Sequence, residues 1–125
     1  MTILITPASG YGGTCILFDG VRLWRPPDAE EIAWLDGHIL YTPTWWERTG
    51  QVVWSFDGYE LRPIYGSRSA WLFDDEMLWP EDGGRSKGWL FNGRELKPVN
   101  NPEGDVWVAS NDIPWPIMLR AAALI

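Results

Sequence analysis

The chain has few of the residues on which covalent and metal-centred chemistry depends. Its 125 residues include one cysteine and one histidine. Cys15 has no second cysteine to pair with, which excludes an internal disulfide and leaves the redox compartment open. His38 follows Gly37 directly in a predicted turn, and alone it supports neither a standard zinc site nor a nucleophile activated by histidine. We therefore expect no metal, no cofactor and no catalytic residue, and a protein that is not an enzyme.

Positive charge and long apolar runs are also scarce. Ten Lys and Arg stand against 17 Asp and Glu, for a formal net charge of -7, and the basic residues are scattered singly. A phosphate-binding surface needs clustered cations, so nucleic acid is not an expected partner. No stretch approaches the roughly 20 apolar residues that span a bilayer. Residues 1–7 lack the basic region and the apolar length of a secretory signal. We expect a soluble protein without a membrane partner, in the cytoplasm by default.

Aromatic residues, by contrast, are abundant and recur in a pattern. The clearest copy is residues 89–98, Trp-Leu-Phe-Asn-Gly-Arg-Glu-Leu-Lys-Pro, with the skeleton Trp-x-Phe-Asp/Asn-Gly-x-x-Leu-x-Pro. Copies of this skeleton, some degraded, return roughly every 18 residues, which indicates a repeat architecture. The six copies occupy residues 15–26, 32–43, 52–63, 69–80, 87–98 and 105–116. We expect one all-β domain built from six repeats, preceded by a strand over residues 2–6.

Each repeat has the pattern of a β-hairpin. Asp-Gly or Asn-Gly between runs of Trp, Phe, Val and Leu is the strongest short-range hairpin signal, because a type I′ turn needs positive φ at both central residues. A two-residue turn of this kind would place the Trp, the Phe, the residue after Gly and the Leu on one face. A three-residue loop with a glycine bulge would shift the pairing by one. The repeated carboxylates are expected to bond the turn backbone; they are Asp19, Asp36, Asp57 and Asp74.

The spacing of the turns suggests how the hairpins are arranged. The turns alternate in spacing, which hints at three units of two hairpins, and such units suit a β-trefoil or small propeller blades that limit exposed edges. The likeness of all six hairpins instead favours a single-file stack with capped ends. Of the two, we expect the closed, pseudo-threefold arrangement.

The last residues, 116–125, differ in kind from the repeats. Proline at a first helical position and three alanines favour a short helix. Only Arg120 is charged in this segment, and a helix that is apolar nearly all round must be buried. We expect it to plug or cap the open side of the hairpins. The alternative is a homo-oligomer contact through Trp115 and this tail.

The function classes that remain depend on aromatic residues outside the core. The tryptophans that begin the later repeats are expected to form core; they are Trp54, Trp71, Trp89 and Trp107. The position before each closing proline holds rings and cations instead, and the connector after the second hairpin adds two neighbouring rings. The candidate ligand-binding residues are therefore Trp24, Tyr41, Trp45, Trp46, Arg62 and Trp79.

Two kinds of partner fit exposed rings beside polar groups. A ring face covers the apolar face of a sugar while polar groups take its hydroxyls, which predicts a non-catalytic carbohydrate-binding module. The same rings anchor protein interfaces, so an interaction domain with an acidic, inhibitor-like surface is the alternative. Rings that cover hairpin ends or fill the core are a third interpretation. The tandem aromatic hairpins resemble the choline-binding repeats of bacterial cell-wall proteins and, more loosely, small repeat lectins, but the Phe-Asp-Gly and Leu-x-Pro pattern departs from theirs and assigns no family.

Overall fold

The computed structural model describes residues 2–8, 15–26, 30–43, 51–64, 68–74, 76–100 and 106–125, and for Gln51 the backbone alone. The strands are β1 (Ile3–Pro7), β2 (Ile16–Phe18), β3 (Arg22–Arg25), β4 (Glu30–Asp36), β5 (Ile39–Pro43), β6 (Gln51–Phe56), β7 (Glu60–Pro63), β8 (Trp71–Asp74), β9 (Met77–Pro80), β10 (Trp89–Phe91), β11 (Glu95–Pro98) and β12 (Trp107–Ala109). The helices are the 3-10 turn η2 (Arg85–Lys87) and α1 (Trp115–Ala121). Neither helix in this described part has the length and apolar character that crossing a bilayer requires.

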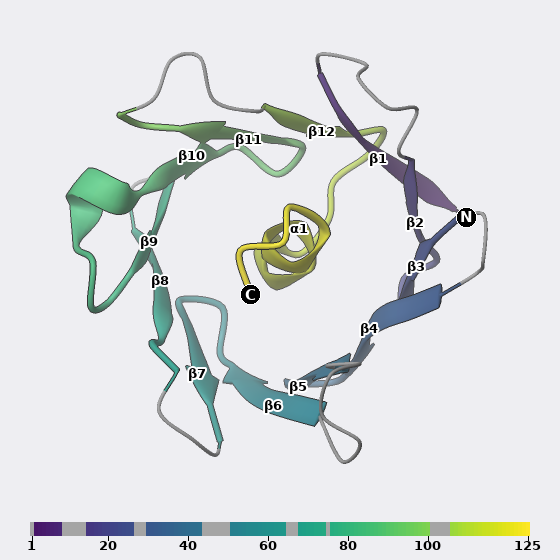
Figure 1. Ribbon diagram of the computed structural model, residues 1–125, viewed down its shortest axis with the longest axis horizontal. Helices are drawn as coiled ribbons and strands as arrows, with labels where there is room; N and C mark the ends of the chain where they lie inside the picture. The colour runs from purple at the N-terminus through teal and green to yellow at the C-terminus, as the bar shows by residue number, and fades with distance from the viewer. Residues whose placement is uncertain are drawn as a thin grey trace.

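The strands form one closed antiparallel barrel around α1. Each strand pairs with its predecessor and its successor in the chain, and β1 pairs with β12 to complete the ring. Figure 1 shows the ring end-on, with α1 seen down its own axis at the centre. Closure leaves no strand edge open for pairing with another chain, which removes the usual route to edge-to-edge aggregation.

The expectations of a nearly all-β fold, closure and a short C-terminal helix are confirmed. The trefoil-like and propeller-like forms are not: the hairpins stand side by side in chain order around one ring. The alternative that was considered, a single-file stack, is wrong, because a stack has two capped ends and this ring is closed. Both expectations missed the pairing of β1 with β12, which spans almost the whole chain.

The sixth predicted hairpin, over residues 105–116, is also wrong in its second half. Its first strand is observed as β12, but β12 pairs with β1 and β11, and the chain then turns into α1 instead of returning as a strand. Pro114 and Pro116 have no amide hydrogen to give to a ladder, and Pro116 lies at the start of α1, where a missing N–H is tolerated. The apolar residues that follow are buried in the barrel interior.

Three hairpin turns, β2–β3, β6–β7 and β10–β11, share one geometry that differs from the expected one. In the turn between β6 and β7, Phe56 pairs with Leu61, so Gly58 and Tyr59 form the corner and Asp57 lies before it. Gly58 has φ of +99°, a conformation that favours glycine. The residue after Gly consequently points away from the core, and Tyr59 is 74% exposed.

Asp57 stabilises this corner through its side chain. Its Oδ1 accepts hydrogen bonds from the amides of Tyr59 and Glu60, at 2.9 and 2.8 Å. Equivalent pairs of bonds are made by Asp19 and Asn92. The expected structural role of the turn carboxylates is therefore confirmed for Asp19 and Asp57.

These bonds predict an acid-sensitive stability. The amides of Tyr59 and Glu60 hold the pKa of the Asp57 carboxyl below its usual value of 3.8. Asp57 thus contributes stability above its ordinary pKa, and this contribution is lost as the pH falls through the lower pKa of the folded state. Asp57→Asn keeps the acceptor oxygen without the charge, as Asn92 does naturally. We expect unfolding free energies measured from about pH 5 to about pH 2 to fall less steeply for Asp57→Asn than for the wild type.

The matched control for this experiment is Asp36→Asn. It removes a carboxylate from an equivalent turn, where the side chain makes no hydrogen bond to the residues that the structure describes. If both variants changed the pH profile equally, the backbone bonds of Asp57 would not be the cause.

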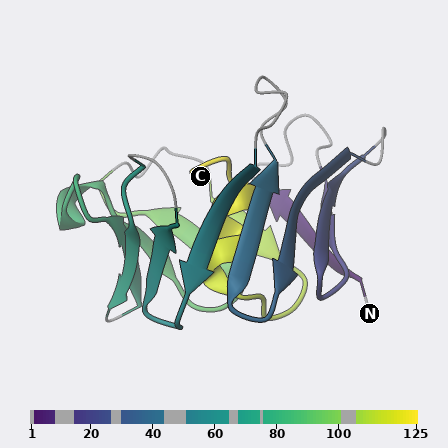
Figure 2. The same cartoon turned by 90° about the horizontal axis from the view of Figure 1, so that it is seen from below.

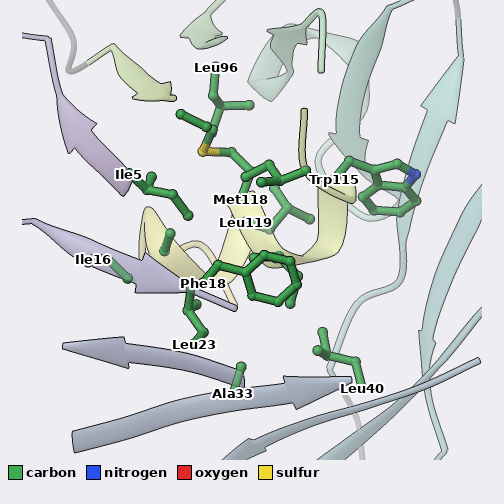
Figure 3. Close-up of a cluster of buried hydrophobic side chains, with 14 of the residues drawn as sticks. Ile5, Ile16, Phe18, Leu23, Ala33, Leu40, Leu96, Trp115, Met118 and Leu119 are labelled. Atoms are coloured by element: carbon green, nitrogen blue, oxygen red, sulfur yellow. The ribbon is translucent and has the colours of Figure 1, made fainter. Parts of the chain in front are cut away.

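The core lies between the inner face of the barrel and α1. The tryptophans that begin the repeats point inward, with Trp54 and Trp71 buried and Trp89 and Trp107 packed against the core at partial burial. Figure 3 shows Met118 and Leu119 of α1 at the centre of a ring of strand side chains, among them Ile5, Phe18 and Leu40. The buried plug expected from the tail is this helix.

Polar contacts hold both ends of α1. At its start, Trp115 Nε1 donates to the carbonyl of Gly58 at 3.0 Å. Near its end, Arg120 donates to the carbonyls of Ile32 and Pro43. Trp115 is 5% exposed, so its side chain is buried within the folded barrel. The homo-oligomer contact through Trp115 and the tail stays a prediction.

Candidate functional site

In the part of the chain that the structure describes, α1 occupies the interior of the barrel. Small barrels of other proteins bind ligands inside the ring or at its mouth. Here Ile117, Met118 and Leu119 are fully buried against the inner faces of the strands. Any binding site must therefore lie on the outer wall or at one of the two ends.

The candidate residues that follow the leucine of each repeat do not meet in one place. Trp24, Tyr41, Arg62 and Trp79 lie on β3, β5, β7 and β9, and the inward neighbour of each is a buried leucine. Alternation therefore points all four to the outside. Since they occupy every second strand, the ring spreads them around its circumference (Figure 1).

Two of these residues, Arg62 and Trp79, are already in contact with charged side chains of the protein itself. Arg62 forms ion pairs with Glu60 and Glu81, both at 2.9 Å, and hydrogen bonding and charge from Glu60 raise its pKa. Trp79 is half-buried, with the guanidinium carbon of Arg85 5.6 Å from its ring centroid. Its buried indole nitrogen has no hydrogen-bond partner among the described residues. The guanidinium of Arg62 is thus paired with carboxylates, and Arg85 lies over the Trp79 ring.

The remaining candidates are Trp24, Trp45, Trp46 and Tyr41, and the structure gives each of them a different outcome. Trp24 is half-buried beside Leu17 and Glu31, its partners across the sheet. Trp45 and Trp46 lie outside the described residues. Tyr41 is the candidate that the fold brings into a constellation with other functional side chains.

That constellation is centred on a ring pair, Trp34 on β4 and Tyr41 on β5. The two residues are direct cross-strand partners on the outer face. Their ring centroids lie 5.0 Å apart and their planes differ by 14°, so the rings are stacked. Such pairs contribute about 0.5–1.5 kcal/mol beyond the area they bury. The stacking fixes both rings before any ligand arrives.

Trp34 was missed in the sequence, although a signal was present. In its repeat, Ala33 stands where four of the other five copies have tryptophan, and Trp34 falls on a variable position. The observed pairing of Leu35 with Leu40 places Trp34 opposite Tyr41. Had the correct turn been assumed, period-2 alternation alone would have put both rings outside.

The ring pair lines an open depression of about 730 Å³ on the outer wall. Its other walls are apolar at Val21 and charged at Arg22, Glu31 and Asp36. Arg22 Nε and Glu31 Oε1 are 3.5 Å apart across β3 and β4. We call this feature the ring depression.

A β-bulge brings Glu31 to this surface. The register shifts between Leu23 and Trp24, so that Leu23 faces Ala33, Trp24 faces Glu31, and Ile32 has no partner on β3. Ile32 and Ala33 are consequently both buried, and Glu31 falls on the outer face. Without this extra residue, alternation would turn Glu31 toward the core.

The described residues contain no group of three or more His, Cys, Asp and Glu side chains that could hold a metal ion. The fold and the ring depression together define the protein as a closed antiparallel barrel with a helical core and an open, aromatic outer site. Comparison with protein-family models, curated proteins and solved structures finds no match to this chain.

Proposed function

We propose that the protein is a non-catalytic carbohydrate-binding module whose ligand rests in the ring depression. The observation that carries the proposal is the stacked pair of Trp34 and Tyr41 beside charged side chains of both signs. Aromatic surface suits the apolar face of a sugar ring. The guanidinium of Arg22 donates hydrogen bonds and the carboxylates of Glu31 and Asp36 accept them, which suits sugar hydroxyls.

The size and rigidity of the site support the same proposal. Its volume of about 730 Å³ lies within the roughly 300–1,000 Å³ that is typical of small-molecule sites. The rings sit on neighbouring strands of a closed sheet and stack on each other, so little side-chain entropy is lost when a ligand binds. The open shape fits one or two exposed sugar units of a longer chain better than an enclosed small molecule.

Trp34→Ala and Tyr41→Ala are each expected to weaken sugar binding by about tenfold or more, the factor that corresponds to roughly 1.4 kcal/mol. The affinity is measured by the change in intrinsic tryptophan fluorescence when the protein is titrated with neutral mono- and oligosaccharides and with choline. The matched control is Tyr59→Ala, which removes a tyrosine that lies outside the ring depression and is 74% exposed at a turn.

Arg22→Gln provides a gentler variant should a ring substitution disturb the fold, since Arg22 is exposed and lies on the rim of the site. It removes charged donors and should also weaken binding. If sugar binding is saturable but unchanged in all three variants, the sugar site lies elsewhere. If none of the sugars gives a saturable response, the proposal is overturned.

A protein partner is the second candidate, and Val21 is the observation in its favour. Val21 is 51% exposed at the edge of the ring depression, next to the aromatic pair. Apolar, aromatic and arginine side chains together are typical of interface hot spots. Light scattering distinguishes self-association from the sugar proposal: a mass that rises with concentration and returns to that of one chain in Val21→Asp would favour an interface between copies.

A further inference from the structure

We infer that the end of the barrel where the strand connectors lie holds a binding site for a small oxyanion, a phosphate or carboxylate group, lined by Arg25, Arg68 and Arg120. We call this the arginine pocket. It lies at the mouth of the barrel, and it shares no lining residue with the ring depression. Its existence does not depend on the carbohydrate proposal.

The three arginines come from distant parts of the chain. Arg25 ends β3, Arg68 lies between β7 and β8, and Arg120 lies in the last turn of α1. Because α1 starts at the hairpin-turn end, near Gly58, it delivers Arg120 to the opposite end of the barrel. Figure 2 shows the C-terminal end of the chain at the end of the barrel opposite the hairpin turns. The arginines converge on a cavity of about 320 Å³.

Arg120 is held there by main-chain oxygen atoms. Its Nε donates to the carbonyl of Ile32 at 2.8 Å, and its Nη atoms donate to the carbonyl of Pro43 and to a main-chain oxygen of Ile125, the last residue of the sequence, each at 2.7 Å. Ile32 is the extra residue of the bulge, without a partner on β3, so its carbonyl is available to the guanidinium. These bonds use three of the five N–H donors of the side chain. The position of Arg120 is therefore fixed while part of its donor capacity remains.

Among the described residues that line this pocket, Glu30 is the one Asp or Glu side chain, and its contact with Arg25 is 4.0 Å long. No ion pair between the described residues joins Arg68 or Arg120 to an Asp or Glu side chain, although Arg68 also lines a neighbouring hollow with Glu81 and Asp82. Burial, and then the charges of Arg25 and Arg68, lower the pKa of Arg120. The positive charges of the three arginines repel one another, and an anion between them would reduce this repulsion.

The chemistry of the pocket selects the class of ligand. Guanidinium groups match the oxygen pairs of carboxylates and phosphates, and bonds between two charged groups are about twice as strong as neutral ones. The chain has a net charge of -7, yet three arginines and one glutamate line this pocket. The composition of the chain would favour the opposite ratio. The volume, near the lower limit of about 300 Å³ for ligand sites, fits a small molecule.

Thermal unfolding of the full chain tests the site with inorganic phosphate and citrate, each compared with sodium chloride at equal ionic strength. We expect a saturable rise in Tm with phosphate, citrate or both, and none with chloride, because a ligand that binds the folded state raises its stability. The better of the two anions tells whether phosphate or carboxylate is preferred. Isothermal titration calorimetry then gives the affinity directly.

Arg68→Gln is the decisive variant, because Arg68 is exposed and forms no hydrogen bond or ion pair with the residues that the structure describes. We expect it to weaken anion binding by about tenfold. Arg94→Gln is the matched control, since Arg94 is exposed at the hairpin-turn end. Glu30→Gln removes the acidic side chain of the pocket and should tighten binding. Equal responses to anion and chloride, or equal affinities of Arg68→Gln and Arg94→Gln, would overturn the site.

Discussion

Leu119→Ala is expected to lower the free energy of unfolding by about 2–5 kcal/mol, the range for large-to-small substitutions at fully buried positions. Leu119 has no exposed surface and lies in the centre of the barrel, where strand side chains surround α1 (Figure 3). A closed ring of strands cannot collapse readily onto a void at its centre, so the upper part of the range applies. With total stabilities of about 5–15 kcal/mol for such domains, this single change removes a large fraction.

Urea denaturation followed by circular dichroism and by tryptophan fluorescence measures this loss. Leu90→Ala is the matched control: it deletes the same atoms from β10, but Leu90 is 45% exposed on the outer wall. We expect the control to lose about 0.5 kcal/mol or less, as surface changes usually do. Equal losses in the two variants would mean that α1 does not form the centre of the core.

Arg120→Met should lower the free energy of unfolding by about 2–4 kcal/mol, because removing a charged donor leaves buried carbonyls without a partner. Arg120 joins the end of α1 to Ile32 on β4 and to Pro43 on β5. Methionine keeps most of the apolar stem, so the loss reports on the hydrogen bonds and less on packing. The three bonds share one guanidinium, and their contributions are not additive.

The same denaturation experiment checks this expectation, with Arg120→Lys and Arg68→Gln as companions. Lysine keeps the charge but not the planar fork, so it should recover part of the loss. Arg68→Gln removes an arginine from the same pocket and should change stability by no more than about 0.5 kcal/mol. A wild-type stability for Arg120→Met would show that the helix needs no polar attachment to the barrel wall.

Much of the local structure was predictable because it depends on neighbouring residues. Asp57-Gly58 and Asn92-Gly93 mark tight turns wherever they stand between apolar runs, and the structure has a hairpin at each. The inward direction of Trp54 and Trp71 follows from the same repeat. The corner itself was placed one residue too early, because the Asp side chain bonds the backbone and moves the turn to the following two residues.

The functional surface was harder to predict, because equivalent sequence positions do not become neighbours in a ring. Trp24, Tyr41, Arg62 and Trp79 share one place in the repeat, yet the barrel separates each from the next by an intervening strand. Tyr41 instead meets Trp34, a residue at a variable position, because direct cross-strand pairing decides which side chains touch.

By itself, the amino-acid sequence determined the β-hairpins, the inward tryptophans and a buried helix at the end of the chain, because turn chemistry and apolar periodicity act within a few residues. Tertiary structure alone decided the rest. The pairing of β1 with β12 closes the ring, and α1 is buried inside it. The bulge at Ile32 changed which face Glu31 occupies. Arg25, Arg68 and Arg120 are isolated charges along the chain, and they become neighbours only because the closed ring and the helix inside it bring distant segments to the same mouth.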